Sequence, residues 1–275
     1  MDFEKYSVLM SVYKNEDPRY LTIALNSMIK QTIQPDEIVL VEDGPLTDGL
    51  YLVIGKFVKK YPNLFKIVVN EMNLGLGLAL RKGLCACSNE LVARMDTDDV
   101  AGKIRCEKQL AFFKENPDVD IVGGQIEEFI GDISNVVGKR IVPLNDTELK
   151  EYSKVRCPFN HMTVMFKKSV VIDAGNYMDL HYDEDYYLWI RMMELGAKFA
   201  NLESVLVKVR VSEDMYNRRG GLSYFKSEFW LEKYKLNHGI IDIVKFASNS
   251  IKRLIVQVMI PNSIRGWVFR TFARE

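Results

Sequence analysis

Short apolar runs alternate with segments of helical periodicity through the first part of the chain. The apolar runs are predicted strands over 6–12, 38–41, 65–70 and 91–95. Between them, apolar residues recur three and four positions apart, which predicts helices over 19–31, 50–61 and 78–86. Strands that alternate with helices indicate a parallel sheet with right-handed crossovers. The sequence therefore predicts an α/β fold in which helices flank a mostly parallel, Rossmann-like sheet.

The pattern changes after residue 120. An apolar stretch over 121–130 and a second over 140–143 predict a small antiparallel ribbon. The remaining expected elements are strands over 158–166 and 205–211 and helices over 103–116, 169–174, 186–195 and 221–237. The second part of the chain is thus expected to add antiparallel strands to the sheet and to end in helices.

Acidic residues follow three of the predicted parallel strands, at the sheet edge where α/β proteins bind ligands. Glu16 follows the first strand and Asp43 the second, while the fourth leads into Asp96, Asp98 and Asp99. Three carboxylates so close in sequence repel one another unless a cation or hydrogen-bond donors compensate. Such oxygen ligands suit a hard divalent ion such as Mg²⁺ or Mn²⁺. The alternative is an acidic turn that caps the next helix.

A second acidic cluster, Asp183 to Asp185, stands directly before a predicted helix. The helix dipole favours carboxylates there, which is the structural interpretation. The functional interpretation is that one of them is a general base facing the metal site. Arg81 and the pair Arg218 and Arg219 are candidate phosphate partners, with exposed solvated arginines as the alternative.

Composition sets limits on partners and compartment. Basic and acidic residues number 37 each, so we expect no nucleic-acid partner. The four cysteines have neither zinc-site spacing nor the density of a disulfide scaffold, which favours a reducing compartment. Neither a signal peptide nor an apolar run of spanning length is visible. We therefore expect a cytoplasmic protein.

The last segment of the chain differs from the body in its charge. Residues 238–275 hold six basic and two acidic residues among apolar ones. The aromatic and basic residues that interleave there are Trp267, Phe269, Phe272, Arg265, Arg270 and Arg274. This pattern suits helices that lie on an anionic membrane surface, so we expect peripheral contact with the inner face of the cell membrane. Packing on the rest of the chain, or a homodimer contact, is the alternative.

Five short motifs stand in order along the chain. They are 7–13, 41–44, Asn73–Gly75, the Asp96-Thr97-Asp98 triplet and 184–189. Together they resemble the family 2 glycosyltransferases of the GT-A fold, in particular bacterial enzymes that build capsule, exopolysaccharide or lipopolysaccharide chains. The resemblance implies a catalytic domain over 1–220, with a nucleotide-sugar-binding half (1–118) and an acceptor half (119–220). A C-terminal amphipathic helical extension, 221–275, follows.

The resemblance also implies a reaction. It is a metal-dependent, inverting transfer of a sugar from a nucleotide-sugar, usually a UDP-sugar, to a hydroxyl of a glycan or lipid-linked oligosaccharide. Asp98 would bind Mn²⁺ or Mg²⁺, Asp185 would be the base, and Glu184 would contact the acceptor or the donor sugar. The expected donor-binding residues are Val12, Tyr13, Glu16, Asp43, Asn73, Arg81 and Asp96. The expected acceptor or diphosphate contacts are His161, Trp189, Arg218 and Arg219.

Other functions fit parts of the pattern. A sugar-nucleotide nucleotidyltransferase shares the sheet and the metal site, but here no Gly-rich, Arg-containing loop follows the first strand. A catalytically inactive sugar-binding scaffold has no need of intact acids in both clusters. Gly75 and Gly77 follow the third strand rather than the first, which excludes a dinucleotide-dependent oxidoreductase.

Overall fold

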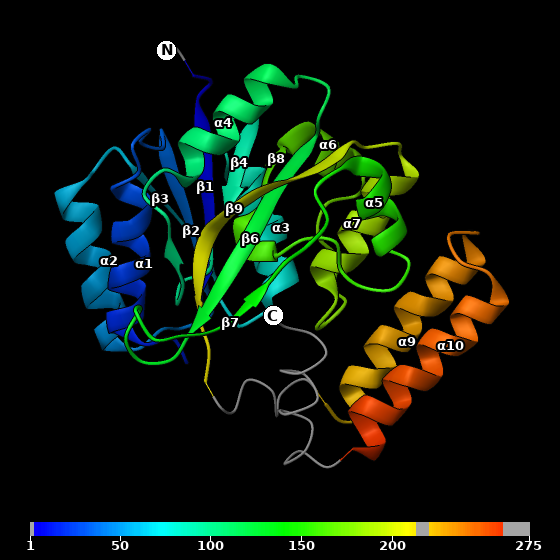
Figure 1. Cartoon of the computed structure of the whole chain (residues 1–275). Helices are drawn as coiled ribbons and strands as arrows, with labels where there is room; N and C mark the ends of the chain where they lie inside the picture. The colour runs from blue at the N-terminus through cyan, green and yellow to red at the C-terminus, as the bar shows by residue number, and fades with distance from the viewer. Residues whose placement is uncertain (1–2, 213–219, 261–275) are drawn as a thin grey trace.

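The structure is a computed structural model that describes residues 3–212 and 220–260, and its first part is the predicted alternation (Figure 1). The elements are β1 (Tyr6–Val12), α1 (Pro18–Ile29), β2 (Glu37–Asp43), α2 (Asp48–Lys60), β3 (Phe65–Asn70), α3 (Leu76–Ala86) and β4 (Leu91–Arg94). The four strands pair in parallel in the order β3-β2-β1-β4. The predicted parallel sheet is confirmed.

Helices cover both faces of this sheet, which explains why its strands are mostly apolar. On β1, Val8 and Met10 pack against α1 and α2 on one face, while Leu9 packs against α3 on the other; all three are fully buried. Local chemistry sets the helix starts. Asp17 accepts a hydrogen bond from the backbone N–H of Arg19, and the proline at the first position of α1 needs no partner for a backbone N–H.

The second part of the chain extends the same sheet on the β4 side. Its elements are β5 (Val100–Ala101), α4 (Arg105–Glu115), β6 (Ile121–Phe129), β7 (Val136–Arg140), α5 (Asp146–Tyr152), the 3₁₀ turn η1 (His161–Thr163), β8 (Met165–Lys167), α6 (Lys168–Asp173), α7 (Glu184–Glu194) and β9 (Phe199–Arg210). Beyond β4 the order is β8-β6-β9-β5, and β7 pairs with β6. Only β6 and β9 are parallel among these described pairs, so the sheet becomes mixed.

Three expectations for this part need correction. The ribbon partner of β6 is 136–140 rather than 140–143, because a turn at 130–135 brings the chain back sooner. The expected strand over 158–166 is mostly a turn. In it Asn160 donates to the Gly124 carbonyl and Thr163 donates to the Asn160 carbonyl, so side chains satisfy groups that a strand would pair. The final strand begins at Phe199 rather than 205, since it runs beside β6 over nearly its full length.

The C-terminal helices α9 (Leu222–Asn237) and α10 (Ile243–Leu254), with the π-helical turn η2 (Ile255–Met259), form a pair beside α7 at one corner of the molecule (Figure 1). Helix α10 turns its polar side inward. Asn249 and Ser250 are buried, whereas Ile243, Val244 and Ile251 are 63%, 73% and 57% exposed. Within the described ranges, no helix combines the length and the apolar character needed to cross a membrane. The division of the chain at residue 220 stays a prediction, and the aromatic and basic residues from 265 onward lie outside the described residues.

Candidate active site

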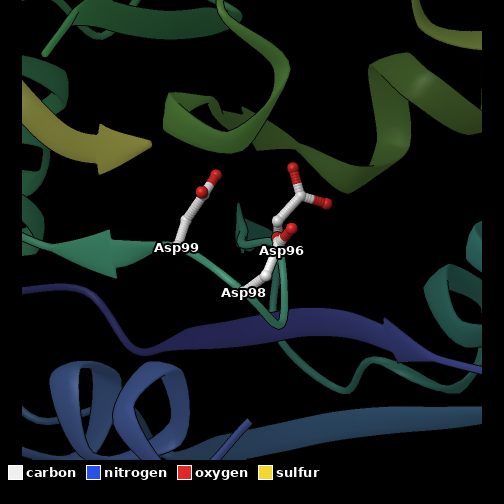
Figure 2. A group of neighbouring side chains, drawn as sticks. All are labelled: Asp96, Asp98 and Asp99. Carbon is white, nitrogen blue, oxygen red and sulfur yellow. The ribbon is translucent and has the colours of Figure 1, made fainter. Parts of the chain in front are cut away.

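The three aspartates after β4 lie on one short loop at the carboxyl edge of the parallel strands. Their side chains extend to the same side of the loop (Figure 2), and one carboxylate oxygen from each lies within 4.8 Å of the others. Asp99 is buried, and Asp96 and Asp98 are half-buried. The sequence prediction that these acids gather at a strand end is therefore confirmed.

Arg94, the last residue of β4, holds the first of these aspartates. Its two terminal nitrogens each lie 2.5 Å from an oxygen of Asp96, which is the bidentate arrangement of a guanidinium and a carboxylate. Burial alone would lower the pKa of Arg94, but the Asp96 carboxylate holds it above its usual value. The position of Arg94 directly before the acidic run is the signal in the sequence that points to this role.

Among the described residues, no arginine or lysine pairs in this way with Asp98 or Asp99. Burial and the charges of Asp96 and Glu16 raise the pKa of Asp98 to about 7. Burial and the neighbouring Asp98 raise the pKa of Asp99, although Asp99 accepts a 2.8 Å hydrogen bond from the backbone N–H of Arg210. A divalent cation would relieve this repulsion, and carboxylate oxygens are the ligands it prefers. The residues present therefore fit a metal such as Mg²⁺ or Mn²⁺.

The loop after β1 is tied to the acidic loop through Glu16. Its carboxylate accepts a 2.7 Å hydrogen bond from the Thr97 hydroxyl and another from the backbone N–H of Asp17. Tyr13, in the same loop, is 40% exposed, while the side chain of Val12 is fully buried in the core. Tyr13 and Glu16 are thus placed to contact a ligand through their side chains, and Val12 only through its backbone.

Asp43 organises the loop after β3. Its carboxylate is buried and accepts hydrogen bonds from the Asn70 amide and from the backbone N–H groups of Leu74 and Gly75. Its carbonyl accepts from the Asn73 amide at 3.2 Å. Gly75 has a φ of +86°, which a residue with a side chain adopts only at a cost. Asp43 therefore fixes the backbone that leads into α3, in addition to any ligand it contacts.

Arg81, on α3, points across to the segment before α7. Its guanidinium donates to the backbone carbonyls of Gly175 and Tyr177 at 3.3 and 3.0 Å. These bonds use part of its donor capacity, so a phosphate contact would have to use the remaining N–H groups.

The second acidic cluster forms the start of α7. Glu184 lies against Gly77 of α3, where an added Cβ would come within 3.0 Å of the Glu184 Cβ. Burial, followed by the charge of Asp185, raises the pKa of Glu184 to about 7. Burial also raises the pKa of Asp185, whose Oδ1 accepts a 2.7 Å hydrogen bond from the backbone N–H of Tyr186.

Two further side chains lie close to Asp185. The Cys157 thiol donates to its Oδ2 across 3.7 Å, and Nδ1 of His161 lies 3.9 Å from the same oxygen. The other ring nitrogen of His161 is 2.9 Å from the Tyr177 hydroxyl. Burial and the Arg94 charge hold the pKa of His161 well below its usual value, so the imidazole is neutral. No motif or spacing in the sequence indicates that Cys157 lies beside the cluster.

Trp189 lies behind the site rather than in it. Its side chain is fully buried and packs edge-on against Phe159 and His161, in the core between α7 and the sheet. A direct contact with an acceptor or a diphosphate does not fit this position, so that expectation is corrected. Arg218 and Arg219 lie outside the described residues.

The aspartate triplet and the start of α7 both open on one cavity of about 1330 Å³. Tyr13, Glu16 and Asp98 line it, as do His161 and Asp185. The cavity continues to the C-terminal helices, where its lining residues are Tyr224, Glu228, Asn249, Lys252, Arg253, Val256 and Gln257. The space is large enough for two ligands, one next to the aspartate triplet and one reaching Asp185.

A mixed sheet with an aspartate triplet at its carboxyl edge and a second acidic cluster across a cavity is the architecture of GT-A glycosyltransferases. A solved structure with this fold, a mannosyltransferase from Pyrobaculum calidifontis in complex with GDP-Man and Mn²⁺, superposes with a TM-score of 0.66 at 14% identity, over 97% of this chain and 74% of that one. At this identity the likeness shows the fold alone, and it confirms the expected fold class.

The sequence matches the family described as Glycosyl transferase family 2 over residues 7–172. It is 43% identical to an amylovoran biosynthesis glycosyltransferase of Erwinia amylovora over 231 residues, covering 84% of this chain and 85% of that protein. It is 37% identical over 274 residues to a UDP-Gal:alpha-D-GlcNAc-diphosphoundecaprenol beta-1,3-galactosyltransferase of Escherichia coli, covering 100% and 98%. The chain belongs to glycosyltransferase family 2 and is a glycosyltransferase.

Proposed function

We propose that this glycosyltransferase moves a sugar from a nucleotide-sugar, in the first place a UDP-sugar, to a hydroxyl of a glycan or lipid-linked oligosaccharide in bacterial polysaccharide synthesis. The observation that carries the proposal is that Asp98, from the aspartate triplet, and Asp185, from the first turn of α7, line the same cavity. The galactosyltransferase of E. coli to which the chain is similar is named for a UDP-sugar donor and a diphosphoundecaprenol-linked acceptor.

The donor lies at the aspartate triplet. Tyr13 and Glu16 contact the nucleoside. Asn73, in the loop whose backbone Asp43 fixes, contacts it as well. Asp96 contacts the ribose or the sugar. Val12 contributes its backbone, and the free N–H groups of Arg81 are available to the diphosphate. Asp98 would hold the metal, which when bound supplies positive charge against the diphosphate of the donor. The Arg94 pair keeps Asp96 in one orientation for this task.

The acceptor lies at the start of α7. The Asp185 carboxylate takes the proton of the acceptor hydroxyl as that oxygen forms its bond to the anomeric carbon. The bond from the anomeric carbon to the diphosphate breaks on the opposite side, so the nucleoside diphosphate leaves and the configuration inverts. Glu184 and His161 flank Asp185, and we assign them to contacts with the sugar or the acceptor.

The outward face of α10 favours a peripheral membrane contact, which a lipid-linked acceptor requires. Ile243, Val244 and Ile251 are exposed on this helix, and Lys245 and Lys252 lie beside them. Apolar side chains flanked by lysines suit the interface of an anionic bilayer. We propose that α10 rests on the inner face of the cell membrane.

The membrane contact is tested by sedimentation with vesicles. We expect the protein to bind vesicles that contain phosphatidylglycerol more strongly than pure phosphatidylcholine vesicles. The variant Val244→Glu/Ile251→Glu should lose this binding, while Lys56→Glu, a change of charge on α2, should keep it. Equal binding by both variants would contradict the contact. A shift from dimer to monomer in gel filtration of the double variant would assign the face to a second copy instead.

The function itself is tested by isothermal titration of UDP, GDP and CMP, each with Mn²⁺ and with EDTA. Binding of UDP that requires Mn²⁺ is the expected result. Binding of GDP or CMP instead would support the same type of transfer with a GDP-sugar or a CMP-sugar as the donor. Folded protein that binds none of the three would contradict the proposal and favour an inactive scaffold.

A further inference from the structure

The segment that leads into the catalytic acids is held by the C-terminal helix α9. The Ser227 hydroxyl donates a 2.6 Å hydrogen bond to the carbonyl of His181. The ring of Tyr182 packs against the ring of Tyr224, with 4.9 Å between the centroids, and against His181 at 4.0 Å. Two successive residues, three and two positions before Glu184, are therefore fixed by side chains from α9.

This segment has a backbone conformation that needs such support. Tyr182 has a φ of +78°, in the left-handed region that residues other than glycine adopt at a cost of about 1–2 kcal/mol. A strained residue of this kind persists where its surroundings hold it. The contacts from Tyr224 and Ser227 are made at this residue and at the one before it. The segment 181–183 sets the direction in which α7 begins. It is thus stabilised by side chains of α9, which lies outside the acceptor half.

The first turn of α7 itself also meets α9 directly. Asp183 is buried, and burial together with the charge of Glu228 raises its pKa well above the usual range. Tyr186 donates to the Ser153 carbonyl at 2.5 Å and accepts from Lys235 at 3.2 Å. Tyr187 packs edge-on against two aromatic rings of α9, Trp230 and Tyr234.

The side chains behind these contacts form a buried, charged network, which allows few arrangements of the helices. Glu228 pairs with Arg253 of α10, and Lys235 pairs with Glu232 at 2.6 Å. Glu232 and Lys235 are fully buried, and Arg253 also lies 3.3 Å from Glu232. Buried charges of this kind tolerate few arrangements, because each must keep its partner. The helices α9 and α10 are therefore held in one position relative to α7.

We propose that α9 is a positioning element for the catalytic base, with Ser227 and Tyr224 as the residues that set the orientation of Glu184 and Asp185. The proposal rests on the proposed function, in which Asp185 takes the acceptor proton. A reacting group that is displaced by about 1 Å loses about 100-fold in rate, so a small change in the turn at 181–183 is enough to reduce turnover. The C-terminal helices are in this sense part of the active site, although they supply neither the base nor the metal ligands.

The test combines kinetics with hydrogen exchange on the full chain. Ser227→Ala removes the bond to His181, and Ser227→Thr keeps a hydroxyl at the same position. Ser223→Ala, on the exposed part of the same helix, is the matched control. We expect Ser227→Ala to lower kcat at saturating acceptor by about 5- to 100-fold. The acceptor KM, the affinity for UDP and the melting temperature should stay close to those of the control, and Ser227→Thr should recover most of the turnover.

Amide hydrogen exchange gives the second readout, and it does not depend on activity. We expect residues 181–187 to exchange faster in Ser227→Ala, and faster still in Tyr224→Ala/Ser227→Ala, than in the Ser223→Ala control. A kcat within twofold of the control, or unchanged exchange over 181–187, would overturn the proposal. Substantial turnover by Asp185→Asn would instead contradict the proposed base, so the two failures are distinguishable.

Discussion

Replacing Arg94 by methionine should both destabilise the protein and change its pH profile. Arg94 is buried and pairs with Asp96 through two contacts of 2.5 Å. Removing one partner of a buried pair costs about 3–5 kcal/mol, because the remaining charge stays without its partner. Asp96 keeps 27% of its side chain exposed, so water recovers part of that loss. We therefore expect a decrease of about 2–3 kcal/mol in the free energy of unfolding.

Urea denaturation followed by tryptophan fluorescence, to which the buried Trp189 contributes, measures this decrease. Arg94→Lys keeps the charge and loses the bidentate geometry, so it should cost about half as much. The double variant Arg94→Met/Asp96→Asn should cost less than the sum of the two single changes, by about 2 kcal/mol, because the interaction between the two side chains is lost only once. Additive costs, or a cost below about 0.5 kcal/mol for Arg94→Met, would refute the reasoning.

The same substitution should act on catalysis through charge. The Arg94 cation lowers the pKa of Asp185 and of Glu184, against the larger upward effect of burial. Asp185 accepts a proton, so activity rises with pH as its carboxylate ionises. Without the cation, that pKa rises and the acidic limb of the kcat profile moves to higher pH. Arg94→Lys should leave the limb near its wild-type position, whereas equal profiles for wild type and Arg94→Met would contradict the argument.

Three further predictions concern the acids themselves. Asp98→Asn should abolish transfer and weaken Mn²⁺-dependent UDP binding in calorimetry. Unchanged binding would indicate that the other two aspartates of the triplet hold the metal. Asp185→Asn should lower kcat by about 10²–10⁴-fold with unchanged UDP affinity, whereas substantial turnover would favour Glu184 or Asp183 as the base. Burial raises the pKa of Glu184 from 4.5 to about 7, so stability is lost as pH rises between these values. Glu184→Gln should therefore stabilise the metal-free protein at pH 8, by about 2 kcal/mol, and have little effect at pH 4; equal effects at both pH values would contradict this shift.

Periodicity predicted the parallel part of the fold because each of its elements carries a local signal. A run such as 6–12 is apolar apart from Ser7 and Ser11, since helices cover both faces of β1. The same signal failed for 158–166, which also holds several apolar residues but is mostly a turn and enters β8 only at Met165. There the conformation depends on Asn160 reaching the carbonyl of Gly124, 36 positions away. Contacts of that sequence separation leave no periodic pattern in the chain.

The acids of the site were recognisable from sequence, whereas the groups that set their chemistry were not. Asp98 and Asp185 stand in dense acidic clusters, so their spacing alone drew attention to them. Arg94 is a single cation in a strand, and Cys157 is a single thiol in a loop. Each matters because of where its atoms lie relative to a carboxylate, at 2.5 Å and 3.7 Å. Sequence spacing cannot report such a distance between residues as far apart as Cys157 and Asp185.

The two acidic clusters therefore differ in what stabilises them, and the difference matches their proposed tasks. Arg94 neutralises Asp96, whereas Asp98 has a pKa of about 7, so under the proposed function Asp98 is the carboxylate whose charge a bound metal would compensate. Asp185 is surrounded by a thiol, a neutral imidazole and a backbone N–H, and the charges of Arg94 and Arg140 lower its pKa against the larger upward effect of burial. Asp185 makes no tight ion pair among the described residues, so under the proposed function its carboxylate, once ionised, is free to take a proton from the acceptor.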